Sequence, residues 1–158
     1  MEQNRVEKTL SVSAIKEGTV IDHIAAGSAL KIISLLRLSE NKTRVTVGLN
    51  LKSRSMGLKD LIKVENLFIS PAHAAQIAIF APKATITAIE NYKVAKKFKV
   101  EMPEAIPSVL MCPNALCITR REPIQTLFTV EENISSVLLR CRFCEKLFSL
   151  DEAHEHQS

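Results

Sequence analysis

The four cysteines of this chain stand in two close pairs, and this arrangement constrains the fold more than any other feature. The first pair bounds the stretch Cys-Pro-Asn-Ala-Leu-Cys, the second bounds Cys-Arg-Phe-Cys, and a loop of twenty-odd residues separates them. Two short knuckles of this kind can place four sulfurs around one metal ion. We therefore predict a tetrahedral zinc site with the ligands Cys112, Cys117, Cys141 and Cys144.

A site with four cysteine ligands is predicted to be structural, because a catalytic zinc ion normally keeps one position open and uses His or carboxylate ligands. Its binding free energy would then largely be the folding free energy of the small domain around it. Other interpretations remain open. Cys141 and Cys144 could form a redox pair, and His154 or His156 could replace one ligand. Disulfides are disfavoured in a cytosolic protein, since reducing compartments keep thiols unpaired.

The composition, 46% hydrophobic and 24% charged, is typical of a globular protein. Apolar stretches such as 29–38 are interrupted by Lys31 and Arg37 and are much shorter than the roughly 18 residues of a membrane span. The first ten residues lack the apolar region of a secretory signal. We expect a cytoplasmic protein without a membrane partner.

The charge is divided unevenly along the chain. Residues 1–100 carry 16 Lys and Arg against 8 Asp and Glu, whereas residues 101–158 carry 5 against 9. The basic part favours an anionic partner, and the acidic part argues against a zinc domain that binds nucleic acid. No Walker loop and no G-x-S-x-G, H-E-x-x-H or G-x-G-x-x-G motif occurs, so we do not expect an enzyme.

The hydrophobic periodicity predicts an α+β domain. Alternation predicts extended segments at 10–15, 19–24, 45–51, 60–68 and 84–90. A 3.6-residue period predicts a helix from Ser28, and Ser70 followed by Pro71 predicts the start of a second helix over 72–80. The order βαββαβ is typical of a ferredoxin-like sandwich, in which two helices cover one face of an antiparallel sheet.

The stretch 101–107 contains two prolines and is predicted to be a linker. We therefore expect two domains, residues 1–101 and residues 102–158. The second domain is too short to bury a large core, and domains of this size generally need a disulfide or a bound metal ion for stability. It is predicted to be a small all-β domain held by the zinc ion.

Several segments together resemble the regulatory chain of aspartate carbamoyltransferase. They are 18–24, 56–66, 81–85, 89–94 and the two cysteine knuckles, and the resemblance covers roughly residues 8–150. It implies a non-catalytic subunit with a nucleotide-binding allosteric domain and a zinc domain that docks on a separate catalytic chain. It also implies a regulatory homodimer, inhibition by CTP, activation by competing ATP, a possible effect of UTP, and control of pyrimidine biosynthesis.

The resemblance further implies which residues bind the effectors. Lys97 would contact the triphosphate, Lys63 and Asp22 the ribose and base, and His23 the ribose or phosphate. Purely structural interpretations remain open, with Lys63 and His23 as solvated side chains and Tyr92 in a core or interface. Catalytic-chain contacts are assigned to Asn114, Arg142 and Glu145. The full set of effector residues carried over by position is Val12, Ser13, Ala14, Ile15, Val20, Asp22, His23, Leu61, Lys63, Thr87, Ile89, Tyr92, Val94 and Lys97.

Overall fold

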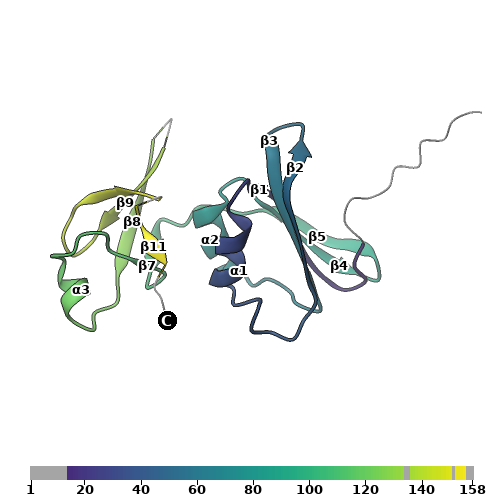
Figure 1. The fold of residues 1–158 in the computed structure, drawn as a ribbon, viewed down its shortest axis with the longest axis horizontal. Coiled ribbons are helices and arrows are strands. Elements are labelled where there is room, and N and C mark those ends of the chain that lie inside the picture. Colours follow the sequence, from purple (N-terminus) through teal and green to yellow (C-terminus); the bar gives the residue numbers. More distant parts are fainter. Residues whose placement is uncertain (1–13, 134–135, 151, 156–158) are drawn as a thin grey trace, which may run out of the picture.

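The computed structural model describes residues 14–133, 136–150 and 152–155. Figure 1 shows two bodies joined by one connection. The N-terminal body consists of β1 (Gly18–Ala25), α1 (Ala29–Leu35), β2 (Val45–Ser53), β3 (Gly57–Glu65), α2 (Pro71–Phe80), β4 (Thr85–Glu90) and β5 (Lys93–Lys99). The C-terminal body consists of β6 (Ala105–Pro107), β7 (Leu110–Met111), α3 (Ile118–Arg121), β8 (Leu127–Glu132), β9 (Val137–Cys141), β10 (Leu147–Ser149) and β11 (His154–Glu155).

The N-terminal body is the predicted α+β sandwich. Its sheet has the order β2-β3-β1-β4-β5, and all neighbouring strands are antiparallel. Helices α1 and α2 lie on the side of the sheet that faces the C-terminal body (Figure 1). Side chains such as Ile21, Ile62 and Ile86 point toward the helices and are buried. Because strand side chains alternate between faces, the other face of the sheet carries a separate set of residues.

Helix α2 begins where the sequence predicts it. The Ser70 hydroxyl accepts a hydrogen bond from the His73 backbone N–H at 3.2 Å, and Pro71 occupies the first turn. The helix buries Ile77 and Ala78 in the core of the N-terminal body, whereas Ile79 belongs to the core of the C-terminal body. Helix α2 therefore packs on both bodies at once.

A buried carboxylate joins three segments at one end of the sheet. Asp60 on β3 is fully buried and accepts hydrogen bonds from the backbone N–H groups of Gly27 (2.9 Å), Ala29 (3.3 Å) and Asn50 (3.0 Å). Three donors compensate the loss of hydration that burial of a charged group would otherwise cost. The same hydrogen bonds hold two segments against β3: the turn between β1 and α1, and the bulge of β2 between Gly48 and Leu51.

Four sequence predictions differ from the structure. The strand predicted at 60–68 is β3, which begins earlier and ends at Glu65. In the segment predicted as a strand at 10–15, Ala14 and Ile15 form no strand and the preceding residues lie outside those described. Among the described residues, β5 and β2 form the two edges of the sheet. Strand β5 was missed because its sequence, Lys-Val-Ala-Lys-Lys-Phe-Lys, lacks regular alternation and is almost entirely exposed. The linker prediction is wrong for 105–107, which pair with β8 as β6.

The C-terminal body contains a four-stranded sheet of order β10-β9-β8-β6 and a short β11–β7 pair. Its fold is β-rich as predicted, with the single-turn helix α3 added after the first knuckle. Its small core contains Ile106, Phe128 and Leu139, together with buried cysteines. Within the described ranges of both bodies, no helix is long and apolar enough to cross a membrane.

The start of β1 generates a test of the sheet packing. Gly18 has φ +135°, and a Cβ there would collide with the carbonyl oxygen of Val64. We expect Gly18→Ala to lower the free energy of unfolding by about 3 kcal/mol or more. Gly57→Ala is the matched control, because Gly57 also has a positive φ of 76° but open space around it, and it should cost about 1 kcal/mol. Urea unfolding of both variants, followed by circular dichroism, checks this; equal losses would contradict it.

Candidate metal centre and binding face

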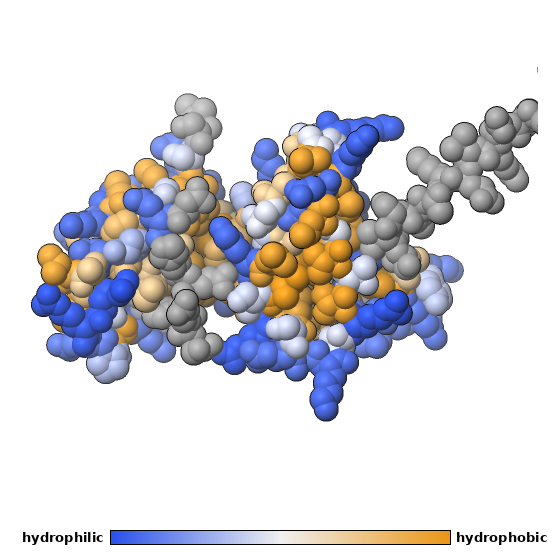
Figure 2. Space-filling model, in the orientation of Figure 1, coloured by the Kyte–Doolittle hydropathy of each residue, from blue (hydrophilic) through white to orange (hydrophobic). Residues whose placement is uncertain are grey.

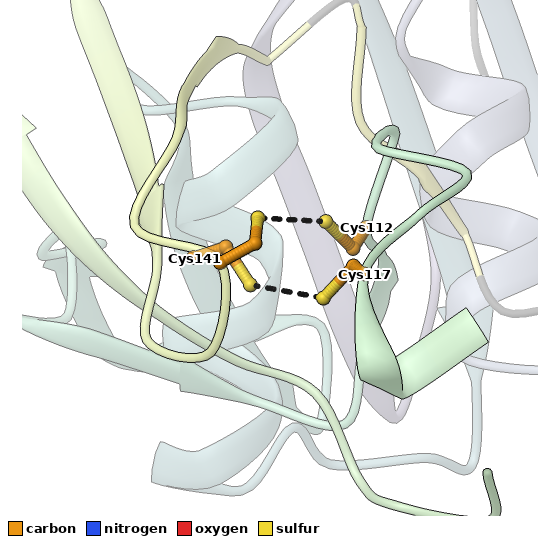
Figure 3. A group of neighbouring side chains, drawn as sticks. Cys112, Cys117 and Cys141 are labelled. Atoms are coloured by element: carbon orange, nitrogen blue, oxygen red, sulfur yellow. Dashed lines mark hydrogen bonds between the residues drawn. The ribbon is translucent and has the colours of Figure 1, made fainter. Parts of the chain in front are cut away.

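The four cysteine sulfurs converge at one point of the C-terminal body. All four Sγ atoms lie within 4.8 Å of one another. The Sγ atoms of Cys112 and Cys144 are 3.8 Å apart, and those of Cys117 and Cys141 are also 3.8 Å apart. Figure 3 shows the labelled cysteines of the two knuckles facing each other across this centre. In a tetrahedron with metal–sulfur bonds of about 2.3 Å, the sulfurs are about 3.8 Å apart, so the four thiols fit one zinc ion.

Local structure holds the two knuckles in place. Cys112 follows β7 and Cys117 is the N-cap residue of α3, so a short loop presents both sulfurs to the centre. Arg120 on α3 donates a hydrogen bond from Nη1 to the Cys112 carbonyl at 2.9 Å. In the second knuckle, Glu145 adopts φ 61° and its N–H donates to the Cys141 carbonyl at 2.9 Å. Each knuckle is therefore a closed turn.

The Thr119 hydroxyl contacts the centre directly. Its Oγ1 donates a hydrogen bond to Cys117 Sγ at 3.2 Å, and the threonine is only 8% exposed. Such a donor stabilises a thiolate and orients it toward the metal. Sequence reasoning missed this residue, although a hydroxyl two positions after a ligand cysteine was the available signal.

The thiols differ in their pKa values in the absence of metal. Burial raises the pKa of Cys112 and of Cys141. Burial also acts to raise the pKa of Cys144, but hydrogen bonds from the Lys146 backbone and the Asn114 side chain outweigh it and lower the value to about 7. A redox cysteine could share that property. The convergence of all four free cysteines distinguishes a metal centre from a two-cysteine redox pair.

Among the described residues, no helix covers the second face of the N-terminal sheet, which we call the open face, and this face carries a row of effector-site candidates. Val20 on β1 pairs with Lys63 on β3 and with Thr87 on β4, and Thr87 pairs in turn with Lys97 on β5. These four residues therefore form one line across four adjacent strands. By strand alternation, Leu61 belongs to the same face of β3 as Lys63. The row places an ammonium group near each end and smaller side chains between them.

A second group lies beside this row, at the bulge of β1. His23 has φ 56°, and its backbone N–H donates to Asp22 Oδ1 at 2.6 Å. Lys59 on β3 forms an ion pair with Asp22, with an Nζ–Oδ1 distance of 2.9 Å. His23 Nδ1 lies 3.4 Å from the Thr85 hydroxyl. The bulge thus brings a histidine, a carboxylate and a lysine to one edge of the row.

Charge and burial shift two pKa values on this face. Burial acts to raise the pKa of Asp22, but the hydrogen bonds from Lys59 and from the His23 backbone, together with the charge of Lys59, outweigh it and lower the pKa. Burial lowers the pKa of Lys63, and the nearby Asp22 charge opposes that shift. Sequence reasoning missed Lys59. The alternation Lys59, Leu61, Lys63 along β3 was the signal that could have found it.

The remaining effector candidates lie at the β4–β5 end of the sheet. Ile89 pairs with Val94 across the β4–β5 hairpin, and Tyr92 lies in its turn. The Tyr92 N–H donates to the Lys16 carbonyl at 3.0 Å, so this turn lies next to the segment that contains Ala14 and Ile15. Tyr92 is 66% exposed, which excludes a position in the core of this chain. Val12 and Ser13 lie outside the described residues.

Comparison with known proteins decides the family. Residues 10–101 match the family model "aspartate carbamoyltransferase regulatory chain, allosteric domain", and residues 104–154 match "aspartate carbamoyltransferase regulatory chain, metal binding domain". The chain belongs to the aspartate carbamoyltransferase regulatory chain family. The resemblance seen in the sequence is therefore confirmed, and the four-cysteine centre is the site of its metal-binding domain.

Curated members of the family are similar over nearly their whole length. The regulatory chain of Chromobacterium violaceum is 48% identical, over 92% of this chain and 96% of its own. That of Photobacterium profundum is 49% identical, over 90% and 93% respectively. That of Edwardsiella ictaluri is 50% identical, over 90% and 94%. All three are named regulatory chains, so the resemblance is to a regulatory and not to a catalytic component.

The surface around the metal centre of this regulatory chain carries the three predicted contact residues. Asn114 is half-buried, and its Oδ1 accepts a hydrogen bond from the Leu116 N–H at 3.1 Å. Arg142 and Glu145 are exposed on the second knuckle. The knuckles and the start of α3 also expose large apolar side chains. These are Leu116 (73% exposed), Ile118 (45%) and Phe143 (43%).

The Thr119 contact generates a test of the metal centre. Thr119→Val removes the hydroxyl while keeping the side-chain shape, and we expect the metal affinity to fall by about tenfold. Thr119→Ser keeps the donor and should resemble the wild type. Zinc release to a chromogenic chelator, measured as absorbance against time, compares the three proteins. Identical release from Thr119→Val and the wild type would show that the hydroxyl does not hold the thiolate.

Proposed function

We propose that this chain is the non-catalytic regulatory subunit of an aspartate carbamoyltransferase and that it controls pyrimidine biosynthesis in the cytoplasm. The domain at 1–101 binds CTP as inhibitor and ATP as activator, and the domain at 102–158 docks on the catalytic chain. The observation that carries the proposal is the row of Lys63, Val20, Thr87 and Lys97 on the open sheet face of a member of this family. The reducing cytoplasm would keep the four thiols free for zinc.

The geometry of the row suits a nucleotide. Lys63 and Lys97 are separated by three strand spacings, about 14 Å in total. An extended nucleotide can lie along such a line with its triphosphate near Lys97 and its base and ribose toward Lys63 and Asp22. Lysine ammonium groups neutralise phosphate charge through charge-assisted hydrogen bonds. Since CTP and ATP share the triphosphate and ribose, one row would hold either of them, and UTP by the same contacts.

The edge of the sheet supports a regulatory homodimer. Strand β2 is an edge strand, and its exposed Val47 and Leu49 lie in the same body as the exposed Leu30 of α1. Figure 2 shows apolar side chains gathered over this side of the N-terminal body. An open strand edge with apolar neighbours is a surface that a second copy can cover. We place the dimer contact there.

The effect of a nucleotide would reach the catalytic chain by linkage. A nucleotide that binds one quaternary state more tightly than another biases the equilibrium, typically by about 1 to 3 kcal/mol. Helix α2 packs on both bodies through Ile77 and Ile79 and provides a mechanical connection between them. The zinc domain would then present Asn114, Arg142 and Glu145, together with the exposed apolar side chains of the knuckles, to the catalytic chain.

The nucleotide site is tested by isothermal titration of the zinc-loaded chain with CTP, followed by ATP in competition. We expect mutually exclusive binding. Lys97→Ala should weaken CTP binding by about tenfold or more, because an ammonium–phosphate contact is lost.

Lys96→Ala is the matched control for that experiment. Lys96 pairs with Ala88 and lies on the opposite face of β5 from Lys97, so its loss should leave CTP affinity unchanged. An oligonucleotide is titrated in parallel. If the oligonucleotide binds and the nucleotides do not, the regulatory proposal fails and the zinc domain becomes a candidate nucleic-acid contact.

Assembly is tested by removing the metal. A chelator, or Cys141→Ser, should unfold the zinc domain and release the chain from the catalytic subunit while CTP still binds to the N-terminal domain. Analytical ultracentrifugation of mixtures with the catalytic chain measures this. In the same experiment Leu49→Lys should turn free regulatory dimers into monomers that retain zinc. Metal-free protein that still cosediments with the catalytic chain would refute the docking role.

A further inference from the structure

A cavity of about 890 Å³ lies on the helix side of the sheet, away from the proposed nucleotide row. Its floor is formed by buried side chains, among them Thr19, Ile86 and Val100. One wall is the N-terminal half of α2 and the segment before it, and another is β5. Residues 99–104, which connect the two bodies, close one end. Its volume is within the range of small-molecule sites, about 300 to 1,000 Å³.

Strand alternation separates this cavity from the nucleotide row. Lys96 and Lys97 are consecutive on β5, so their side chains point to opposite faces of the sheet. Lys97 pairs with Thr87 of the row, whereas Lys96 pairs with Ala88, and both Lys96 and Ala88 line the cavity. A ligand in the cavity would therefore not compete directly with a nucleotide on the open face.

The side chains of the cavity define the chemistry of a ligand. Lys96 Nζ lies 5.3 Å from the centroid of the Phe98 ring, so an ammonium group is held beside an aromatic surface. Phe68, in the segment before α2, is 50% exposed and adds a second aromatic ring to the lining. An ammonium group next to aromatic rings suits a ligand that has a flat apolar part and a negative group near Lys96.

The connecting segment limits the charge of the ligand. Glu101 and Glu104 also line the cavity and are exposed. Their carboxylates would repel a second negative group, which disfavours a nucleotide triphosphate here. Lys99 at the end of β5 is a second cation of the lining, so the two lysines and two glutamates balance in formal charge. Lys96 is the cation beside the aromatic ring, and we therefore expect a single negative group of the ligand near Lys96 and its apolar part toward α2.

We propose that this cavity is a second ligand site, specific for a small monoanion with a flat apolar body. Because residues 99–104 form part of its lining, a bound ligand would also restrain the connection between the two bodies. The site is independent of the nucleotide row and of the metal centre. It would give the chain a regulatory input from a class of compounds other than nucleotides.

The test uses 8-anilinonaphthalene-1-sulfonate, a flat aromatic monoanion that becomes fluorescent in apolar sites, with the zinc-loaded full chain. The chain has no Trp, so protein fluorescence interferes little. We expect saturable one-site binding that excess CTP does not displace. Lys96→Ala should weaken it by about fivefold. Ala75→Phe, which fills the cavity from α2, should abolish it. Lys97→Ala should leave it unchanged.

Several outcomes would overturn the proposal. Absence of saturable binding would do so, as would wild-type affinity in both Lys96→Ala and Ala75→Phe. Displacement by CTP, or loss in Lys97→Ala, would place the probe on the nucleotide row. Binding that weakens as protein concentration rises would assign the cavity to a contact between copies of the chain. Unchanged zinc content and an unchanged melting temperature would show that the Ala75→Phe variant is folded. If CTP binds neither the wild type nor any variant, the proposed nucleotide site fails, but the proposal for the cavity stands.

Discussion

The structure depends on a helix that is buried on two sides. Helix α2 reads Pro-Ala-His-Ala-Ala-Gln-Ile-Ala-Ile-Phe, with apolar residues around most of its circumference. A helix of this composition is stable in water only when neighbours cover more than one face. Here Ile77 packs on the sheet and Ile79 on the core of the C-terminal body. The two bodies therefore share one apolar contact, and a displacement of either must move α2.

Covering one face of the sheet leaves the other free for binding. Both helices pack on the same side of the sheet (Figure 1). By strand alternation, the residues between the buried positions of each strand therefore belong to the other face. The bulge of β1 lies on this side too, and it brings Asp22 into an ion pair with Lys59 of β3. Asp60 fixes β3 beside this bulge through three backbone hydrogen bonds. The alternation of side chains along each strand thus produces both the buried apolar face and the open polar face of the sheet.

The sequence was sufficient where short-range rules decide the structure. The spacing of Cys112 to Cys144 predicted the metal centre, and Ser70 with Pro71 predicted the start of α2. It was insufficient where long-range pairing decides. The sequence of β5 has no regular alternation of apolar and polar residues, and the strand is defined by its backbone pairing with β4. Lys59 meets Asp22 only through the pairing of β3 with β1, and the cavity is lined by α2, β5 and the connecting segment, which are separate in the sequence.

The zinc domain completes the path from the sheet to the knuckles. Its core is so small that Cys112, Cys117 and Cys141 are themselves part of it, beside Phe128 and Leu139. Ile79 of α2 belongs to the same cluster, so packed side chains extend without interruption from the N-terminal body to the cysteines. A zinc ion held by the four cysteines would fix the far end of that path, because metal–thiolate bonds are shorter and more directional than apolar contacts. If the two domains are coupled as proposed, this cluster is the path by which a shift of α2 would reach the knuckles.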